Sequence, residues 1–178
     1  MALFADRGYE HTTVADIAER AGLTARTFFR YFADKREVLF GGSPALQEHM
    51  VAALEAAPAS ASPMAAVAAA MQAVAEVLTD REFSTRRQAV INAHAELRER
   101  ELIKLAALAT ALADGLRRRG VEEPAASLAG EAGVAVFRVA FDRWTDAAED
   151  ETLAGLLNDS FDQLGALTRT KPRAAKAR

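Results

Sequence analysis

The stretch Thr13-Val-Ala-Asp-Ile-Ala-Glu-Arg-Ala-Gly-Leu-Thr24-Ala-Arg-Thr-Phe-Phe-Arg-Tyr-Phe32 decides the fold, because it predicts two short helices joined by a tight turn. Thr13 and Asp16 have the spacing of a capping box at a helix start. Gly22 is typical of a helix end, and Thr24 can cap the helix that follows. Together these signals predict a helix-turn-helix arrangement.

Helical signals continue on both sides of this stretch. Residues 1–7 have the pattern of the last turns of a helix that ends at Gly8. Asp34 can cap a helix beginning at Lys35, which the run Gly41-Gly-Ser-Pro44 should kink or break. Further helices are predicted over residues 64–78, 85–95, 98–119, 124–147 and 152–167, and no strand pattern occurs. The predicted fold class is therefore all-α, with a three-helix head followed by a helical bundle.

The composition argues against several classes of function. The 178 residues are 51% hydrophobic and 26% charged, with a net charge of −3 and no cysteine. Disulfides and thiol catalysis are therefore excluded. The three histidines lack the spacing of a helical zinc site, and no nucleophile-elbow or phosphate-loop glycine pattern occurs. We expect no metal, no cofactor and no enzymatic activity. Without a signal-peptide or membrane-spanning pattern, the expected location is cytoplasmic.

Residues 2–13, 17–24 and 27–32, followed by Lys35 and Leu39, resemble the DNA-binding head of the TetR (tetracycline-repressor) family. The resemblance implies a homodimeric regulator, by base rate a repressor, that binds double-stranded operator DNA and responds to a small-molecule effector. It implies a helix-turn-helix domain at 1–40 and a ligand-binding and dimerisation domain at 41–167. The basic tail, 168–178, is expected to be disordered. The family's first helix normally starts before the position of Ala2, so only its last two turns are expected here.

The resemblance also implies roles for individual residues in DNA binding. Thr13, Tyr31 and Lys35 match positions that contact phosphates, and Thr24 opens the recognition helix. Charge alone does not indicate DNA, although residues 24–31 contain two arginines and no acid. Arg26 is the best candidate for guanine, because its planar fork matches O6 and N7. The remaining predicted DNA-binding residues are Ala25, Thr27, Phe29 and Arg30; Phe29 stands where the family usually has tyrosine.

The apolar helices after residue 41 predict two further surfaces. The last two helices of the family form a dimer interface, and their apolar stripes suggest contacts by Val136, Trp144, Leu153, Leu157, Phe161 and Leu164. The middle helices are expected to hold an effector pocket of mostly apolar side chains. Its predicted lining is Met71, Val74, Leu78, Phe83, Val90, Asn92, Phe137 and Phe141.

The effector and the coupling mechanism follow from analogy. The run Arg138-Val-Ala-Phe-Asp-Arg-Trp144 loosely resembles a TetR subgroup that binds acyl-CoA-like ligands, so a small hydrophobic or acyl-type effector is expected. The helix that starts at Lys35 would link pocket and head, with a hinge at Gly41-Gly42. An alternative stays open: Phe29 and the short first helix also suit a helical ligand-binding protein without functional DNA binding.

Overall fold

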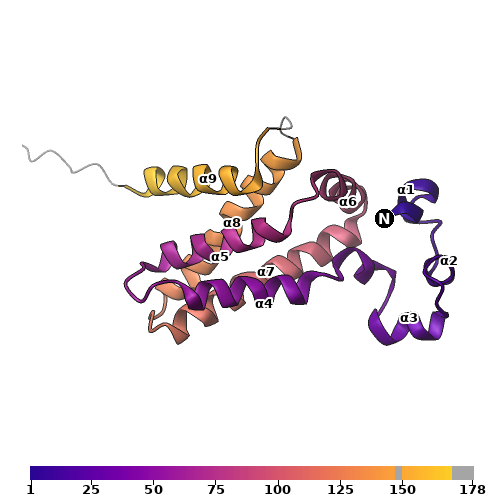
Figure 1. The fold of residues 1–178 in the computed structure, drawn as a ribbon, viewed down its shortest axis with the longest axis horizontal. Helices are drawn as coiled ribbons and strands as arrows, with labels where there is room; N and C mark the ends of the chain where they lie inside the picture. Colours follow the sequence, from indigo (N-terminus) through magenta and orange to yellow (C-terminus); the bar gives the residue numbers. More distant parts are fainter. Residues whose placement is uncertain (147–149, 170–178) are drawn as a thin grey trace, which may run out of the picture.

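The computed structural model describes residues 1–146 and 150–169, and every regular element in them is helical (Figure 1). The head comprises α1 (Ala2–Arg7), α2 (Val14–Arg20) and α3 (Ala25–Tyr31), and a 3-10 helix, η1 (Lys35–Phe40), leads out of it. The body comprises α4 (Ser43–Ala56), α5 (Pro63–Val77), α6 (Arg81–Ala93), α7 (Ala95–Arg118), α8 (Ala125–Asp146) and α9 (Leu153–Thr168). The predicted all-α class is confirmed.

Helix α5 lies at the centre of the body and packs against α4, α8 and α9. It is rich in alanine and buries side chains around most of its circumference, including Val67, Met71 and Val74. Small residues also let the other helices of the body approach one another closely. A Cβ on Gly130 of α8 would lie 2.6 Å from the carbonyl oxygen of Ala109 in α7. The body is therefore a tightly packed bundle in which few positions tolerate added volume.

Several predicted helix boundaries differ from the structure; for example, α7 begins at Ala95 rather than at residue 98. Helix α6 begins at Arg81 rather than at residue 85, because the Asp80 carboxylate accepts a hydrogen bond from the Phe83 amide at 2.8 Å and caps the helix. The helix expected from Lys35 is a 3-10 helix that ends at Phe40, and α4 restarts at Ser43. The predicted break at Gly41-Gly42 is thus confirmed, with Gly42 as the N-cap of α4.

Most of the predicted dimer contacts lie inside the protomer. Val136, Trp144, Leu153 and Leu157 belong to the buried core that α5, α8 and α9 share. Side chains with almost no accessible surface leave little area for contact with a second protomer, so burial does not support these four residues as dimer contacts, and the interface stays a prediction. Phe161 and Leu164 are only partly buried. Helical spacing identified apolar faces correctly but did not reveal which neighbour covers each face.

The C-terminal end of α9 and the length of the helices bear on the predicted tail and on the membrane prediction. Thr168, placed in the tail from sequence, is the last residue of α9, and residues 170–178 lie outside the described part of the chain. None of the helices within residues 1–146 and 150–169 combines the length and hydropathy needed to cross a bilayer.

The head joins the body through a second, smaller apolar core. Phe4 and Tyr9 of the head, with Leu39 and Phe40 of η1, pack against Ile91 of α6 and Leu97 of α7. Figure 1 shows α1 beside the end of the bundle where α6 lies, with α2 and α3 projecting away from it. This core holds α1 and the segment after it against the body and leaves the outer surface of α2 and α3 uncovered.

Candidate nucleic-acid interface

The turn between α2 and α3 sets the angle of the second helix. Gly22 has φ +67°, a left-handed conformation that glycine adopts without strain. The Leu23 amide donates to the Ala18 carbonyl at 2.8 Å, which closes the end of α2. Thr24 then caps α3, because its hydroxyl accepts from the Thr27 amide at 3.1 Å. The predicted helix-turn-helix is therefore present with the predicted turn and cap.

Helix α3 has a buried face and an exposed face. Phe28 is 3% exposed and lies against the Phe32 ring with centroids 5.2 Å apart, and α3 packs on α2. Ala25 and Arg26 are exposed on the first turn, and Thr27 is half-buried. Within residues 1–146 and 150–169, Arg26 forms no ion pair, so its guanidinium is available to a base edge.

Arg30 and Tyr31 form a pair at the far end of α3. The Arg30 guanidinium donates to the Tyr31 hydroxyl at 2.9 Å and lies 4.8 Å from the ring centroid. Phe29 beside them is 57% exposed but has no hydroxyl to donate. The exposed end of α3 therefore presents one guanidinium and one phenol together, groups that bind phosphate oxygens.

Thr13 is engaged in the capping box that the sequence predicts. Its hydroxyl donates to the Asp16 carboxylate at 2.6 Å and accepts from the Asp16 amide at 3.2 Å. Hydrogen bonds from the Thr13 side chain and backbone hold the pKa of Asp16 below its usual value. The carboxylate thus places negative charge at the start of α2, and a phosphate at Thr13 would compete with it for the hydroxyl proton.

Lys35 does not face solvent as a phosphate contact would. Its ammonium donates to the carbonyl oxygens of Tyr9 at 2.9 Å and Thr12 at 3.3 Å. The predicted DNA-binding residues Thr24, Ala25, Arg26, Phe29, Arg30 and Tyr31 are exposed on α3 and its cap. Lys35 alone among the nine predicted residues is turned into the head.

Charged contacts that no sequence pattern indicated join η1 to the body. The Glu37 carboxylate accepts from Arg100 at 2.5 Å and from Lys104 at 3.1 Å, both on α7. The Arg87 side chain of α6 donates to the Leu39 carbonyl at 2.7 Å. These partners lie 48 to 67 positions apart in the chain, beyond the reach of any local sequence pattern.

A Glu37→Gln substitution tests this junction. Burial alone would raise the pKa of Glu37, but hydrogen bonds from Arg100 and Lys104 outweigh it and lower the pKa from its ordinary value of 4.5. The ion pairs of Glu37 therefore contribute their full stabilisation of the folded state above pH 4.5. This contribution is lost as the pH falls through the lowered pKa of Glu37 in the folded protein. We expect the variant to lose about 1–2 kcal/mol at pH 7. The difference in unfolding free energy should shrink below about pH 4.

Urea unfolding of both chains between pH 3 and pH 7 measures that difference. Glu99→Gln is the control, because Glu99 is an exposed carboxylate on the same helix as Arg100 and Lys104. Equal losses for the two variants, or a Glu37 difference that does not depend on pH, would contradict the assigned role of the junction.

The predicted effector residues fall into two groups. Met71, Val74, Leu78, Phe137 and Phe141 pack in or against the main apolar core, with the two phenylalanine rings 5.6 Å apart. The other three lie on α6. Val90 packs against the second, smaller apolar core between head and body, Phe83 is 43% exposed, and Asn92 is exposed. The structure therefore does not gather all eight residues around one site.

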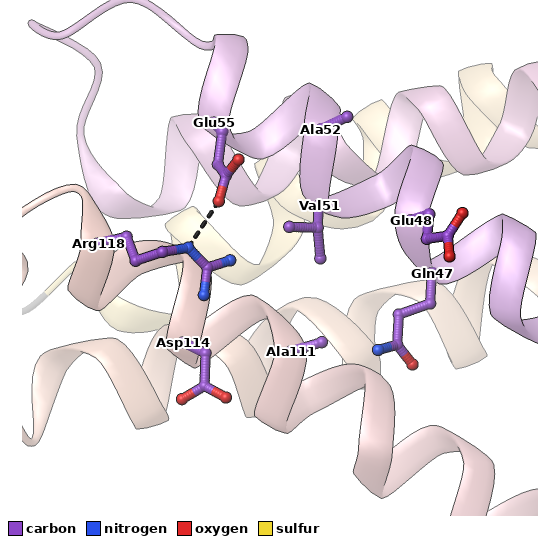
Figure 2. Close-up of a pocket in the computed structure, with 8 residues that line it drawn as sticks. All are labelled: Gln47, Glu48, Val51, Ala52, Glu55, Ala111, Asp114 and Arg118. Atoms are coloured by element: carbon purple, nitrogen blue, oxygen red, sulfur yellow. Dashed lines mark hydrogen bonds and ion pairs between the residues drawn. The ribbon is translucent and has the colours of Figure 1, made fainter.

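A groove of about 390 Å³ lies between α4 and α7 (Figure 2). Val51 and Ala111 give it an apolar floor, and Glu48 and Asp114 stand on its rim. The Arg118 guanidinium donates to the Glu55 carboxylate at 2.7 Å, so its positive charge is already balanced. The rim is thus acidic, and none of the predicted effector residues lines it.

Comparison with known proteins gives two family matches and one curated relative. Residues 1–40 match the family described as bacterial regulatory proteins, tetR family, and residues 61–169 match the MftR C-terminal domain. The chain is 45% identical over 83 residues to the HTH-type transcriptional regulator TcmR of Streptomyces glaucescens. That alignment covers 47% of this chain and 37% of TcmR, so it spans little more than a third of the relative's length.

Solved structures share the fold. FadR of Thermus thermophilus, a TetR-family repressor solved with lauroyl-CoA, superposes with a TM-score of 0.54 at 22% identity, covering 100% of this chain and 95% of FadR. PfmR, also of Thermus thermophilus, gives 0.50 at 25% identity and 92% coverage of each chain. A Rhodococcus sp. Rha1 regulator gives 0.51 at 22% identity, covering 96% of this chain and 94% of that one.

The two family matches agree with the helix-turn-helix geometry and with the predicted class of regulator rather than enzyme. The second match alone covers more than half of the chain. This protein belongs to the TetR family of bacterial transcriptional regulators and has an MftR-type C-terminal domain.

Proposed function

We propose that this chain is a homodimeric repressor that a small hydrophobic or acyl-type effector releases from its operator. The main support for this proposal is the amphipathic helix α3. Its Phe28 side chain is buried, whereas Arg26 is exposed and forms no ion pair among the described residues. Residues 1–40 would read DNA, and residues 41–167 would bind effector and partner. A twofold dimer would place two copies of α3 about one turn of DNA apart.

The main core is the place for the apolar part of the effector. Met71, Val74, Phe137 and Phe141 bring flexible and aromatic side chains together between α5 and α8, where an acyl chain could replace their mutual contacts. FadR, which shares this fold, was solved with lauroyl-CoA. The acidic groove between α4 and α7 is a poor place for the phosphates of coenzyme A, because like charges repel.

Coupling between effector and head would run through η1. The helical conformation is interrupted at Gly41-Gly42, so α4 does not continue as one rigid helix into η1. Side chains instead connect η1 to α6 and α7, through Arg87 and through Glu37. An effector that displaces α6 or α7 would move η1 with them. Release then requires the effector to bind the displaced state more tightly than the DNA-bound state.

Competition on DNA tests the proposal. Fluorescent operator DNA, isolated by selection from a random pool, is bound to the protein and titrated with lauroyl-CoA, laurate or coenzyme A. Release by lauroyl-CoA or by laurate, but not by coenzyme A, is the expected result. Binding of an acyl compound, followed by calorimetry, without any change in DNA affinity would contradict the proposed release mechanism. Failure to select any DNA would instead favour a ligand-binding protein without DNA binding.

The dimer surface that we propose differs from the one expected from sequence. Leu128, Ala135 and Val139 are exposed on α8 at spacings of seven and four residues, which places them in one stripe. At the end of α9, Leu167 is 84% exposed. An exposed apolar stripe on α8, with exposed Leu167 on the adjacent α9, suits a four-helix interface between two copies.

A Val139→Glu substitution should therefore separate the protomers. Val139 is 53% exposed, and a carboxylate there would be buried without a partner in the dimer. We expect the dimer dissociation constant to rise at least tenfold, measured by sedimentation velocity. Ile103→Glu on α7 is the matched control, because Ile103 is 52% exposed. Dissociation by Ile103→Glu, with Val139→Glu unaffected, would move the interface to α7.

A further inference from the structure

The ammonium of Lys35 occupies a cup of backbone carbonyls. It donates to the oxygens of Tyr9 at 2.9 Å, Thr12 at 3.3 Å and Glu10 at 3.5 Å. It also lies 4.2 Å from the centroid of the Tyr9 ring, over its electron-rich face. A lysine ammonium has three N–H bonds, so these carbonyls account for all of its donors.

The cup is formed by the segment that joins α1 to α2. Gly8 turns the chain with φ +79°, and the buried Thr12 hydroxyl donates back to the Gly8 carbonyl at 2.8 Å. The Tyr9 ring packs against Phe4 and His94 at centroid distances of 5.4 and 4.8 Å. This segment ends at the first turn of α2, so its shape determines where the helix-turn-helix sits on the body.

We propose that Lys35 is a positioning residue for DNA binding, acting as an internal cation that holds the α1–α2 segment, and not as a contact to a DNA phosphate. Its charge neutralises three converging carbonyl dipoles, which would otherwise repel one another. The proposal rests on the DNA-binding function of the chain. It goes beyond that function because it assigns to Lys35 a role inside the head.

The salt dependence of DNA binding distinguishes the two roles. Each phosphate contact contributes about 0.9 to the slope of log K against log salt concentration on duplex DNA. A Lys35→Met variant should weaken binding about tenfold at every salt concentration and leave that slope unchanged. A slope lower by about 0.9 would overturn the proposal, because it would show a lost phosphate contact.

A charge-conserving variant supplies a second criterion. A planar guanidinium cannot direct its donors into a cup shaped for a compact ammonium, so Lys35→Arg should bind DNA as weakly as Lys35→Met. Full affinity in Lys35→Arg would overturn the proposal. Arg36→Met is the matched control, because Arg36 is an exposed neighbour that pairs with Asp34 and donates to none of these carbonyls. It removes the same charge and should bind nearly normally.

Hydrogen exchange of the Lys35→Arg chain provides a readout without DNA. The Thr12 amide donates to the Tyr9 carbonyl at 3.3 Å, and this bond should open more often once the cup loses its cation. Faster exchange at Thr12, with unchanged exchange at Ile91 in α6, is the expected result. Unchanged exchange at Thr12 would contradict the positioning role whether or not the chain binds DNA.

Discussion

A Phe28→Ala chain is expected to lose operator binding while the body stays folded. Phe28 is 3% exposed and is the buried anchor of α3, and truncating a buried phenylalanine costs about 3–5 kcal/mol. Helix α3 packs on α2 and is far from the main core, so the loss falls on the head. Because a protein that is only fractionally competent binds proportionally more weakly, operator affinity should fall more than about tenfold in anisotropy titrations.

The neighbouring residue provides the control for that experiment. Phe29 has the same side chain but is 57% exposed, so Phe29→Ala should change the unfolding free energy by no more than about 0.5 kcal/mol. Circular dichroism should show loss of only the small helical content of the head in Phe28→Ala. Equal losses of unfolding free energy for the two substitutions would contradict the assignment of an inner and an outer face to α3.

The second large effect is expected at Gly130. An added Cβ would lie 2.6 Å from the Ala109 carbonyl oxygen and 3.3 Å from the Ala113 amide nitrogen, both in the backbone of α7. Backbone cannot rotate away as a side chain can, so Gly130→Ala must push α7 and α8 apart. We expect a loss of about 2–3 kcal/mol, seen as a fall of about 5–10 °C in melting temperature.

Gly165→Ala should change stability in the opposite direction. Gly165 also lies in a helix, α9, but an added Cβ would meet no atom within 4 Å. Alanine is favoured over glycine in a helix by about 0.5–1 kcal/mol, so a small rise in melting temperature is expected. A stable Gly130→Ala chain would show that α7 and α8 are less closely packed than the structure indicates.

The sequence predicted those parts of the fold that depend on local geometry. The capping box of Thr13 and Asp16, the glycine turn at Gly22 and the cap at Thr24 involve residues at most five positions apart. Such signals act within one helical turn, so they can be read without knowing the tertiary structure. The same holds for the break at Gly41-Gly42.

Tertiary partners could not be predicted in this way. Leu157 and Val139 both lie in apolar stripes, yet Leu157 is fully buried in the protomer and Val139 is exposed. Which neighbour covers a face depends on how the helices cross, which periodicity does not encode. Lys35 shows the same limit for charge: its identity suggested a phosphate, whereas the fold directs it to carbonyls 23 to 26 positions away. The roles of the DNA-binding and effector residues remain predictions.

Selection of binding sites from a random DNA pool tests the central claim most directly. The purified protein is mixed with the pool, and the DNA that it binds is recovered, amplified and sequenced. Anisotropy titrations then compare the affinity for the selected site with that for scrambled DNA. The account predicts an enriched inverted repeat with half-site centres about 10–10.5 base pairs, or a multiple of that, apart. It also predicts binding at least about 10³-fold tighter than to scrambled DNA. A pool that stays unenriched, with equal affinity for all sequences, would contradict it.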